Sequence, residues 1–197
     1  MDLLIATSPA WTETVLADFD AFLADHAACE RKASGMAISL CTHYPDKPSL
    51  VLAMSELAVE ELVHYREVLK WMAQRGVQQR PDQKDRYIMA LHKCMRRGTH
   101  AFLRDRLLLA GIIECRGHER FGLVAAALPA GPLKQFYRSL TQSEDRHHEL
   151  FLALAQKLCP RDRATYEDQT GVSQRLSELL SAEANIIETL PLRSALH

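Results

Sequence analysis

Two short patterns in the sequence could bind a metal ion. In each, a histidine follows a glutamate by three residues: Glu61 with His64, and Glu144 with His147. Residues three apart lie on the same face of a helix, separated by about 4.5 Å along its axis, so both side chains can reach one ion. One such pair in a helical protein is weak evidence, whereas two of them indicate a repeated site.

A single glutamate precedes each pair by an almost constant interval. Glu30 lies 31 residues before Glu61, and Glu114 lies 30 residues before Glu144. The sequence therefore predicts two similar helical hairpins, each supplying two carboxylates and one imidazole. Four converging carboxylates would repel one another unless cations lay between them, and two divalent ions would leave such a cavity neutral. Hard oxygen donors with one imidazole per metal favour iron or manganese over zinc or copper.

The elements that must position these residues are helices. Apolar residues recur at helical spacing in four long and two shorter stretches. The predicted helices are about 11–40, 49–76, 85–95, 99–128, 133–158 and 173–188. Ser49 is the expected N-cap of the second long helix. Long amphipathic helices bury their apolar stripes against one another, so we predict an all-α bundle.

Each of the four long stripes is interrupted near its middle by one of the glutamates, and both histidines lie on these stripes. A lone carboxylate in a core would be costly, whereas a metal site explains all four. The alternative, in which the single glutamates lie at helix edges and the histidines pack in the core, requires four coincidences. The predicted metal ligands are Glu30, Glu61, His64, Glu114, Glu144 and His147.

Other acids and histidines near these positions are weaker candidates. His148 could compete with His147, because Asp145 precedes it by three residues, but Asp145 lies one step off the stripe. His26 and His118 flank the single glutamates by one turn, which favours a supporting or core role over ligation. The acids that fall off the stripes are predicted to be solvated; they are Glu56, Glu60, Glu119 and Glu149.

The composition is that of an ordinary globular protein. With 197 residues, 47% of them hydrophobic and 25% charged, we predict a single domain over residues 1–197. No apolar run approaches the roughly 20 residues that cross a bilayer, so we expect a soluble, cytoplasmic protein with no membrane partner. The five cysteines are odd in number and include no Cys-x-x-Cys pair, which favours reduced core thiols over disulfides or a zinc site.

Positive charge is concentrated in residues 75–106. This segment carries a net charge of +6, whereas the whole chain carries −1. A concentrated positive field attracts polyphosphates, so the segment predicts an anionic partner, with a solvated helical face as the alternative. Its basic residues are candidates for contacts with RNA phosphates: Arg75, Arg80, Lys84, Arg86, Lys93, Arg96, Arg97, Arg104 and Arg106.

The ligand pattern is similar to that of the ferritin-like di-iron carboxylate proteins. Four runs of sequence further resemble the tRNA-modifying monooxygenases that hydroxylate the isopentenyl group of 2-methylthio-N6-isopentenyladenosine beside the anticodon. These runs are Cys29-Glu30-Arg31-Lys32-Ala33, Glu60-Glu61-Leu62-Val63-His64-Tyr65, Cys115-Arg116-Gly117-His118-Glu119-Arg120-Phe121 and Ser143-Glu144-Asp145-Arg146-His147-His148.

The resemblance implies a fold and an activity. The expected fold is a ferritin-like four-helix bundle with an additional short helix and a C-terminal helix. The expected cofactor is a pair of non-haem iron ions, with dioxygen as co-substrate and two electrons from an external donor or reductase. The expected partner is tRNA, contacted in its anticodon region, and the protein would be a monomer or a small homo-oligomer.

Three other functions are compatible with parts of the sequence. A ferritin-like iron-oxidising or iron-storage protein would share the ligand set, but would not need the basic segment. Another bundle oxidase could act on a small or carrier-bound substrate, and an acidic carrier would also favour a basic surface. A non-enzymatic helical interaction protein would leave the buried acids unexplained.

Overall fold

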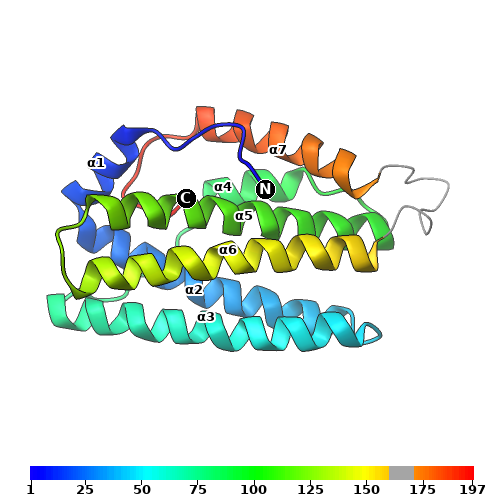
Figure 1. Ribbon diagram of the computed structural model, residues 1–197, viewed down its shortest axis with the longest axis horizontal. Coiled ribbons are helices and arrows are strands. Elements are labelled where there is room, and N and C mark those ends of the chain that lie inside the picture. Colours follow the sequence, from blue (N-terminus) through cyan, green and yellow to red (C-terminus); the bar gives the residue numbers. More distant parts are fainter. Residues whose placement is uncertain (160–170) are drawn as a thin grey trace. The chain divides into compact units, whose positions relative to one another are not determined.

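The computed structural model describes residues 1–159 and 171–197, and this part of the chain contains helices and no strands (Figure 1). The all-α prediction is therefore confirmed for the described residues. The helices are α1 (Pro9–Ala17), α2 (Phe19–His43), α3 (Pro48–Arg75), α4 (Arg86–Lys93), α5 (Thr99–Ala127), α6 (Pro132–Leu158) and α7 (Val172–Thr189).

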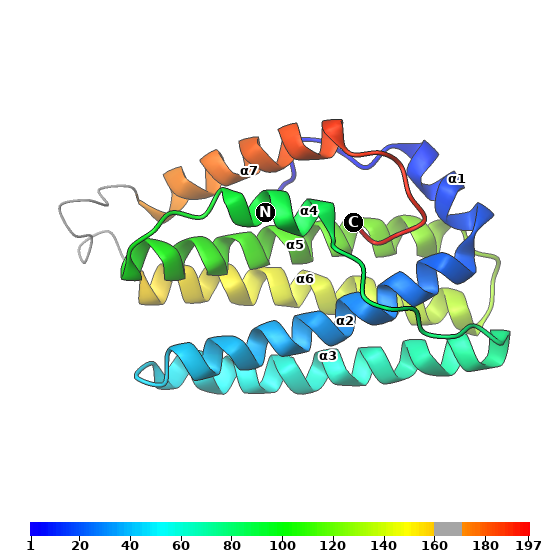
Figure 2. The same cartoon turned by 180° about the vertical axis from the view of Figure 1, so that it is seen from behind.

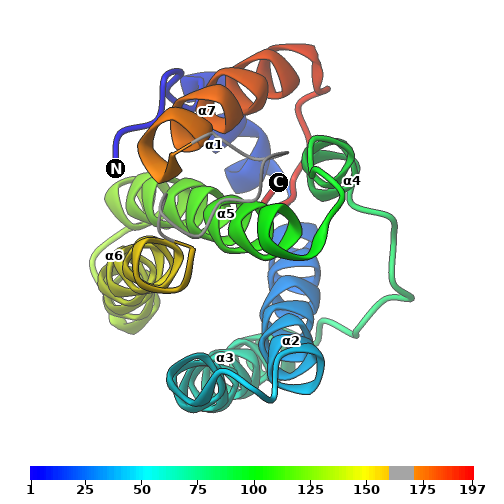
Figure 3. The ribbon, with the colours of Figure 1, turned by 90° about the vertical axis from the view of Figure 1, so that its right-hand side faces the viewer.

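The chain divides into two compact units. The first comprises Met1–Thr12, Lys84–Pro191 and His197, and the second comprises Glu13–Gln83 and Leu192–Leu196. In the first unit α5 and α6 pack side by side, and α7 contacts both α4 and α5 (Figure 2). In the second unit α2 and α3 form the corresponding hairpin (Figure 3). The expected single domain over residues 1–197 stays a prediction.

The first predicted helix, 11–40, is wrong in one respect, because the chain forms two helices there. Asp18 leaves the helical conformation, and its carboxylate accepts a hydrogen bond from the Ala21 N–H at 3.1 Å. Aspartate is a favoured N-cap because its side chain satisfies a free N–H of the first turn. The predicted cap at Ser49 is also wrong: Lys47 is the N-cap of α3, and Pro48 occupies the first turn, where its missing N–H costs nothing.

The α2–α3 hairpin is held by apolar burial and by polar contacts between the helices. Phe22, Leu40 and Met54 are fully buried. The Ser34 hydroxyl donates to the Ala58 carbonyl at 2.8 Å, which joins α2 to α3 near the positions of the predicted ligands. Helix α3 ends at Gly76, whose φ of 70° is the left-handed conformation that favours glycine at a helix C-terminus.

A buried polar network joins the elements of the first unit. Arg116 on α5 and Glu183 on α7 are both completely buried, and Arg116 Nη2 lies 2.8 Å from Glu183 Oε1. The Tyr87 hydroxyl of α4 donates to the same carboxylate at 3.0 Å, and Arg116 also donates to the Ile5 carbonyl at 2.9 Å. Arg116 on α5 thus contacts α7 and the N-terminal segment directly. It is linked to α4 through the Glu183 carboxylate that it shares with Tyr87.

Glu119 belongs to this network, so the prediction that it is a solvated acid is wrong. Its carboxylate accepts a hydrogen bond from the Thr7 N–H at 2.8 Å and from Arg116 Nη1 at 2.5 Å. It lies one turn from Arg116 on α5, where its negative charge stabilises the buried guanidinium.

None of the helices in residues 1–159 and 171–197 combines the length and the apolar character that crossing a membrane requires. None of the five cysteines, all of which lie among the described residues, forms a disulfide, and Cys115 and Cys159 are buried.

Candidate metal centre

Three of the predicted ligands meet within the second unit. Helix α2 supplies Glu30, and α3 supplies Glu61 and His64. His64 Nδ1 lies 3.4 Å from Glu61 Oε2 and 3.7 Å from Glu30 Oε2, so these three side chains can offer ligand atoms to one ion. Glu61 is 1% exposed and Glu30 is 4% exposed. The hairpin therefore brings one Glu-x-x-His pair and its single glutamate together, as their spacing predicts.

A second histidine supports Glu30 from within its own helix. His26 lies one turn before Glu30 on α2 and is fully buried, and its Nε2 lies 2.6 Å from Glu30 Oε1. His64 contacts the other oxygen of the same carboxylate. Glu30 is thus fixed by two imidazoles.

The electrostatics of this cluster favour positive charge beside the carboxylates. Burial raises the pKa of Glu30, but hydrogen bonds from His26 and His64 outweigh it and hold that pKa below its ordinary value. For His64, burial lowers the pKa, but Glu30 and Glu61 outweigh it and raise the pKa to about 10. The two carboxylates therefore stabilise a cation at this position, which is what a metal site requires.

The other three predicted ligands meet in the same way within the first unit. Helix α5 supplies Glu114, and α6 supplies Glu144 and His147. His147 Nδ1 lies 3.7 Å from Glu144 Oε2 and 3.9 Å from Glu114 Oε2, and all three residues are buried. Gly117 lies one turn beyond Glu114, where a Cβ would come within 3.7 Å of the Glu144 side chain. This is an ordinary van der Waals distance, so the Glu144 carboxylate packs directly beside Gly117.

The donor set fits iron or manganese. Each unit presents two buried carboxylates and one imidazole, a combination of hard oxygen donors with a single nitrogen. Two such sets carry four negative charges, which two divalent ions would balance. Burial of all four glutamates, expected from their positions on apolar stripes, is confirmed. That the two sets share one dinuclear centre stays a prediction.

The competing histidines have other surroundings. His148 Nδ1 lies 3.6 Å from an oxygen of Asp145, whose side chain is 55% exposed. His118 Nδ1 lies 2.8 Å from the Thr141 carbonyl and joins α5 to α6. Within the described ranges neither histidine belongs to a group of three metal-binding side chains. Both observations fit the supporting role that the sequence predicts for His118 and the preference for His147 over His148.

The predicted RNA-contacting residues divide into an exposed group and a group that makes contacts within the protein. Five are exposed and lie in loops or on α4. They are Arg80, Lys84, Arg86, Lys93 and Arg97.

The other four make contacts within their own units. Arg75 Nε lies 2.6 Å from Asp20, Arg96 Nη2 lies 2.8 Å from Asp105, and the Arg106 guanidinium lies over the Phe102 ring. Arg104 is 1% exposed and does not present its guanidinium at the surface. We therefore correct the predicted set by removing Arg104, which the sequence could not distinguish from its exposed neighbours.

Sequence reasoning missed the pair formed by Arg116 and Glu183. The two residues are 67 positions apart, so no local spacing connects them. The only available signal was that both lie within amphipathic helices.

The described residues are helical and carry two sets of two buried carboxylates and one histidine that could hold metal ions, an arrangement that is ferritin-like in class. The family model described as tRNA-(MS[2]IO[6]A)-hydroxylase (MiaE) matches residues 2–197, and the chain belongs to this family. The resemblance seen in the sequence is thus confirmed.

Two curated relatives carry the name tRNA 2-(methylsulfanyl)-N(6)-isopentenyladenosine(37) hydroxylase. The protein from Pseudomonas putida is 36% identical over 183 residues, which cover 93% of this chain and 85% of the relative. The protein from Salmonella typhimurium is 31% identical over 163 residues, which cover 83% of this chain and 56% of the relative.

A solved structure shows the same fold. It is described as protein 43 with aldehyde deformylating oxygenase activity, from Synechococcus. The two structures superpose with a TM-score of 0.89 at 35% sequence identity, covering 99% of this chain and 94% of the other. The predicted ferritin-like fold class is confirmed by this likeness.

Proposed function

We propose that this protein is a non-haem di-iron monooxygenase that hydroxylates the isopentenyl group of 2-methylthio-N6-isopentenyladenosine in tRNA. The observation that carries the proposal is the pair of matched ligand sets, Glu30 with Glu61 and His64, and Glu114 with Glu144 and His147. Membership of the hydroxylase family and the names of the curated relatives support the substrate.

In this proposal the two sets share one centre and hold two iron ions. When bound, the ions supply two electrons and open coordination positions for dioxygen. One oxygen atom enters a C–H bond of the substrate and the other leaves as water, so each turnover consumes two protons and two electrons from an external donor or reductase.

The protein's own residues balance the charge of the ions, orient the ligands and exclude water from the site. The four carboxylates would balance the charge of the two ions. The imidazole of each set would be its third ligand. His26 holds Glu30 in one orientation through the 2.6 Å contact. Burial of the set excludes water, which protects a reactive oxidant from side reactions.

The tRNA is bound through its phosphates in this proposal. The exposed basic residues of the segment 75–106 would contact the anticodon region, and such contacts weaken as salt rises because counterions are released on binding. We assign the activity to the cytoplasm and expect a monomer or a small homo-oligomer.

A second candidate is an oxygenase that acts on a small substrate. The observation that favours it is the 35% identity and TM-score of 0.89 to the Synechococcus protein described as having aldehyde deformylating oxygenase activity. Its ligand sets would serve a similar oxygen chemistry, but the basic segment would have no role.

The test supplies reduced, iron-loaded protein with ¹⁸O-labelled dioxygen and isopentenylated tRNA, followed by mass spectrometry of the nucleosides. We expect one labelled oxygen in the isopentenyl group. A Glu144→Ala variant is the control and should give none. If the wild-type centre reacts with dioxygen and the nucleoside stays unlabelled, the hydroxylase proposal is wrong; turnover of an aldehyde would then favour the second candidate.

A further inference from the structure

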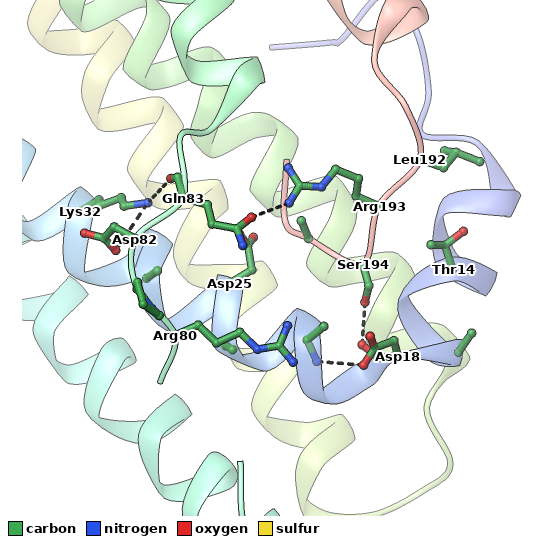
Figure 4. Close-up of a pocket in the computed structure, with 16 residues that line it drawn as sticks. Thr14, Asp18, Asp25, Lys32, Arg80, Asp82, Gln83, Leu192, Arg193 and Ser194 are labelled. Atoms are coloured by element: carbon green, nitrogen blue, oxygen red, sulfur yellow. Dashed lines mark hydrogen bonds and ion pairs between the residues drawn. The ribbon is translucent and has the colours of Figure 1, made fainter. Parts of the chain in front are cut away.

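A cavity of about 460 Å³ lies within the second unit, along one side of α2 (Figure 4). Its floor is a row of alanines, and its walls are formed by residues 80–83 and 192–195. Cavities of this size bind small ligands. The alanines of the floor are Ala17, Ala21, Ala24 and Ala28.

The cavity lies on the side of α2 that faces away from the metal ligand. At 3.6 residues per turn, Ala21 and Ala28 are about 160–180° around the helix from Glu30, whereas His26 is within about 40° of it. The thickness of a helix, about 10 Å, therefore separates the cavity from the carboxylate cluster. A molecule bound here is not the group that undergoes oxidation.

Two arginines of this cavity have no carboxylate partner in the part of the chain that the structure describes. Arg80 extends its guanidinium across the cavity, and Arg193 donates to the neutral Gln83 side chain at 3.0 Å (Figure 4). Among residues 1–159 and 171–197, neither guanidinium forms an ion pair. Lys32 adds a third positive charge, although it lies 3.9 Å from an oxygen of Asp82.

The three acids that line the cavity are already engaged. Asp18 caps α2 by accepting the Ala21 N–H, and Asp25 accepts the Leu196 N–H at 2.8 Å. Asp82 pairs at 2.6 Å with Arg31, a residue that does not line the cavity. The lining thus holds three cations and three acids, and because these acids already accept hydrogen bonds or an ion pair, the guanidiniums of Arg80 and Arg193 are left to bind an anion.

We propose that this cavity binds one nucleotide of the tRNA, other than the nucleotide that is hydroxylated. Arg80 and Arg193 bind its phosphate, because the planar guanidinium donates two parallel hydrogen bonds to phosphate oxygens. The apolar alanine floor receives the face of the base. The choice of tRNA as partner rests on the proposed function.

Free nucleotides carry the same chemistry as a nucleotide of RNA. We assign the cavity to tRNA because Arg80 belongs to the basic segment 75–106, whose net charge of +6 suits a polyanion better than a single phosphate. The experiment therefore needs one arm for each source.

The first arm measures binding of an unmodified tRNA transcript by fluorescence anisotropy over a range of salt concentrations. For the double variant Arg80→Gln/Arg193→Gln we expect affinity to fall at least about tenfold and the salt slope to fall by about 1 for each lost phosphate contact. The matched control is Arg66→Gln, which removes an exposed arginine of α3 outside the cavity and should leave both unchanged. Unchanged affinity and slope in the double variant would overturn the proposal.

A second variant separates the base from the phosphate. Ala28→Leu adds volume to the floor while keeping a good helix former at a half-buried position. Affinity for the transcript should fall at least about threefold, with the salt slope unchanged because no charge is lost. Wild-type affinity in this variant would contradict the assignment of the floor to the base.

The second arm titrates wild-type protein with adenosine 5′-monophosphate. One outcome would assign the cavity to free nucleotides and overturn the proposal. In it, wild-type protein binds adenosine 5′-monophosphate saturably below about 1 mM, and the double variant loses this binding but keeps its affinity for tRNA. The transcript carries no isopentenyl group, so these results do not depend on hydroxylation. Loss of tRNA binding in the double variant would support the cavity even if the labelled-oxygen experiment failed.

Discussion

His26 Nε2 lies 2.6 Å from Glu30 Oε1, and both side chains are buried on α2. This contact fixes one oxygen of a predicted metal ligand, while His64 lies near the other oxygen at 3.7 Å. A histidine one turn before a glutamate therefore determines which way the carboxylate faces before any ion binds.

Replacing His26 should weaken metal binding without removing it. Supporting residues of this kind change metal affinity by about 10- to 100-fold. We expect His26→Ala to lower the affinity for ferrous iron by a factor in that range. His26→Gln can still donate to Glu30 and should recover part of the lost affinity. Iron content after dialysis against a graded chelator measures the affinity, and wild-type affinity in His26→Ala would show that Glu30 needs no such support.

The six predicted ligands should determine metal stoichiometry. We expect wild-type protein to bind two iron ions per chain, and Glu114→Ala or His147→Ala to abolish stoichiometric binding of two ions, because each removes a third of one donor set. Metal analysis by mass spectrometry after reconstitution gives the number directly. Retention of two irons by both variants would rule out the ligand assignment.

The control for that experiment is Glu149→Ala, since Glu149 is exposed on α6. Glu119→Ala is unsuitable, because Glu119 accepts hydrogen bonds from Thr7 and Arg116. Its loss would disturb folding and mimic a loss of metal.

The fold was predictable from the sequence where helical periodicity and punctuation agree. Gly76, Gly98 and the proline-containing turn before α6 end or begin helices within a few residues of the predicted positions. The break at Asp18 was not predictable in this way, because apolar residues keep their spacing across it and only the capping hydrogen bond reveals it.

The site was predictable to the extent that its chemistry is local. A Glu-x-x-His pair within one helix fixes its own geometry, and the 30- and 31-residue intervals place the single glutamates on the partner helix of each hairpin. Contacts between distant residues had no such signal. Arg104 and Arg116 were indistinguishable in sequence from exposed arginines, yet both are buried.

Breaking the Arg116–Glu183 pair should be strongly destabilising. Both groups are completely buried, so Arg116→Met leaves the Glu183 carboxylate without its guanidinium partner, and Glu183→Gln leaves Arg116 with only the partly exposed Glu119, at a cost of about 3–5 kcal/mol. Chemical denaturation monitored by circular dichroism measures this free energy. The double variant Arg116→Met/Glu183→Leu should lose less than either single variant, and equal or additive losses would show that the pair is not coupled.

The last prediction concerns acid. Asp85 Oδ1 accepts the Ile88 N–H at 3.0 Å and so caps α4, and Asp85 Oδ2 lies 3.1 Å from His197 Nδ1. Burial raises the pKa of this carboxyl, but His197 and the backbone N–H groups outweigh it and lower the pKa to about 2, against an ordinary value of 3.8. Because the folded pKa is the lower one, the carboxylate stabilises the fold above about pH 4, and this contribution is lost as the pH falls toward 2.

Asp85→Asn should therefore lower the free energy of unfolding by about 1–2 kcal/mol at pH 6, since it removes the charge but keeps an oxygen that can cap α4. The difference between variant and wild type should stay constant above about pH 5 and shrink by about half near pH 3. Urea unfolding at a series of pH values measures it. Asp46→Asn is the matched control: Asp46 is exposed, its pairing with Lys47 is screened by solvent, and its loss should change stability little at any pH. A difference for Asp85→Asn that did not change between pH 6 and pH 3 would show that the charge of Asp85 is not what stabilises this end of α4.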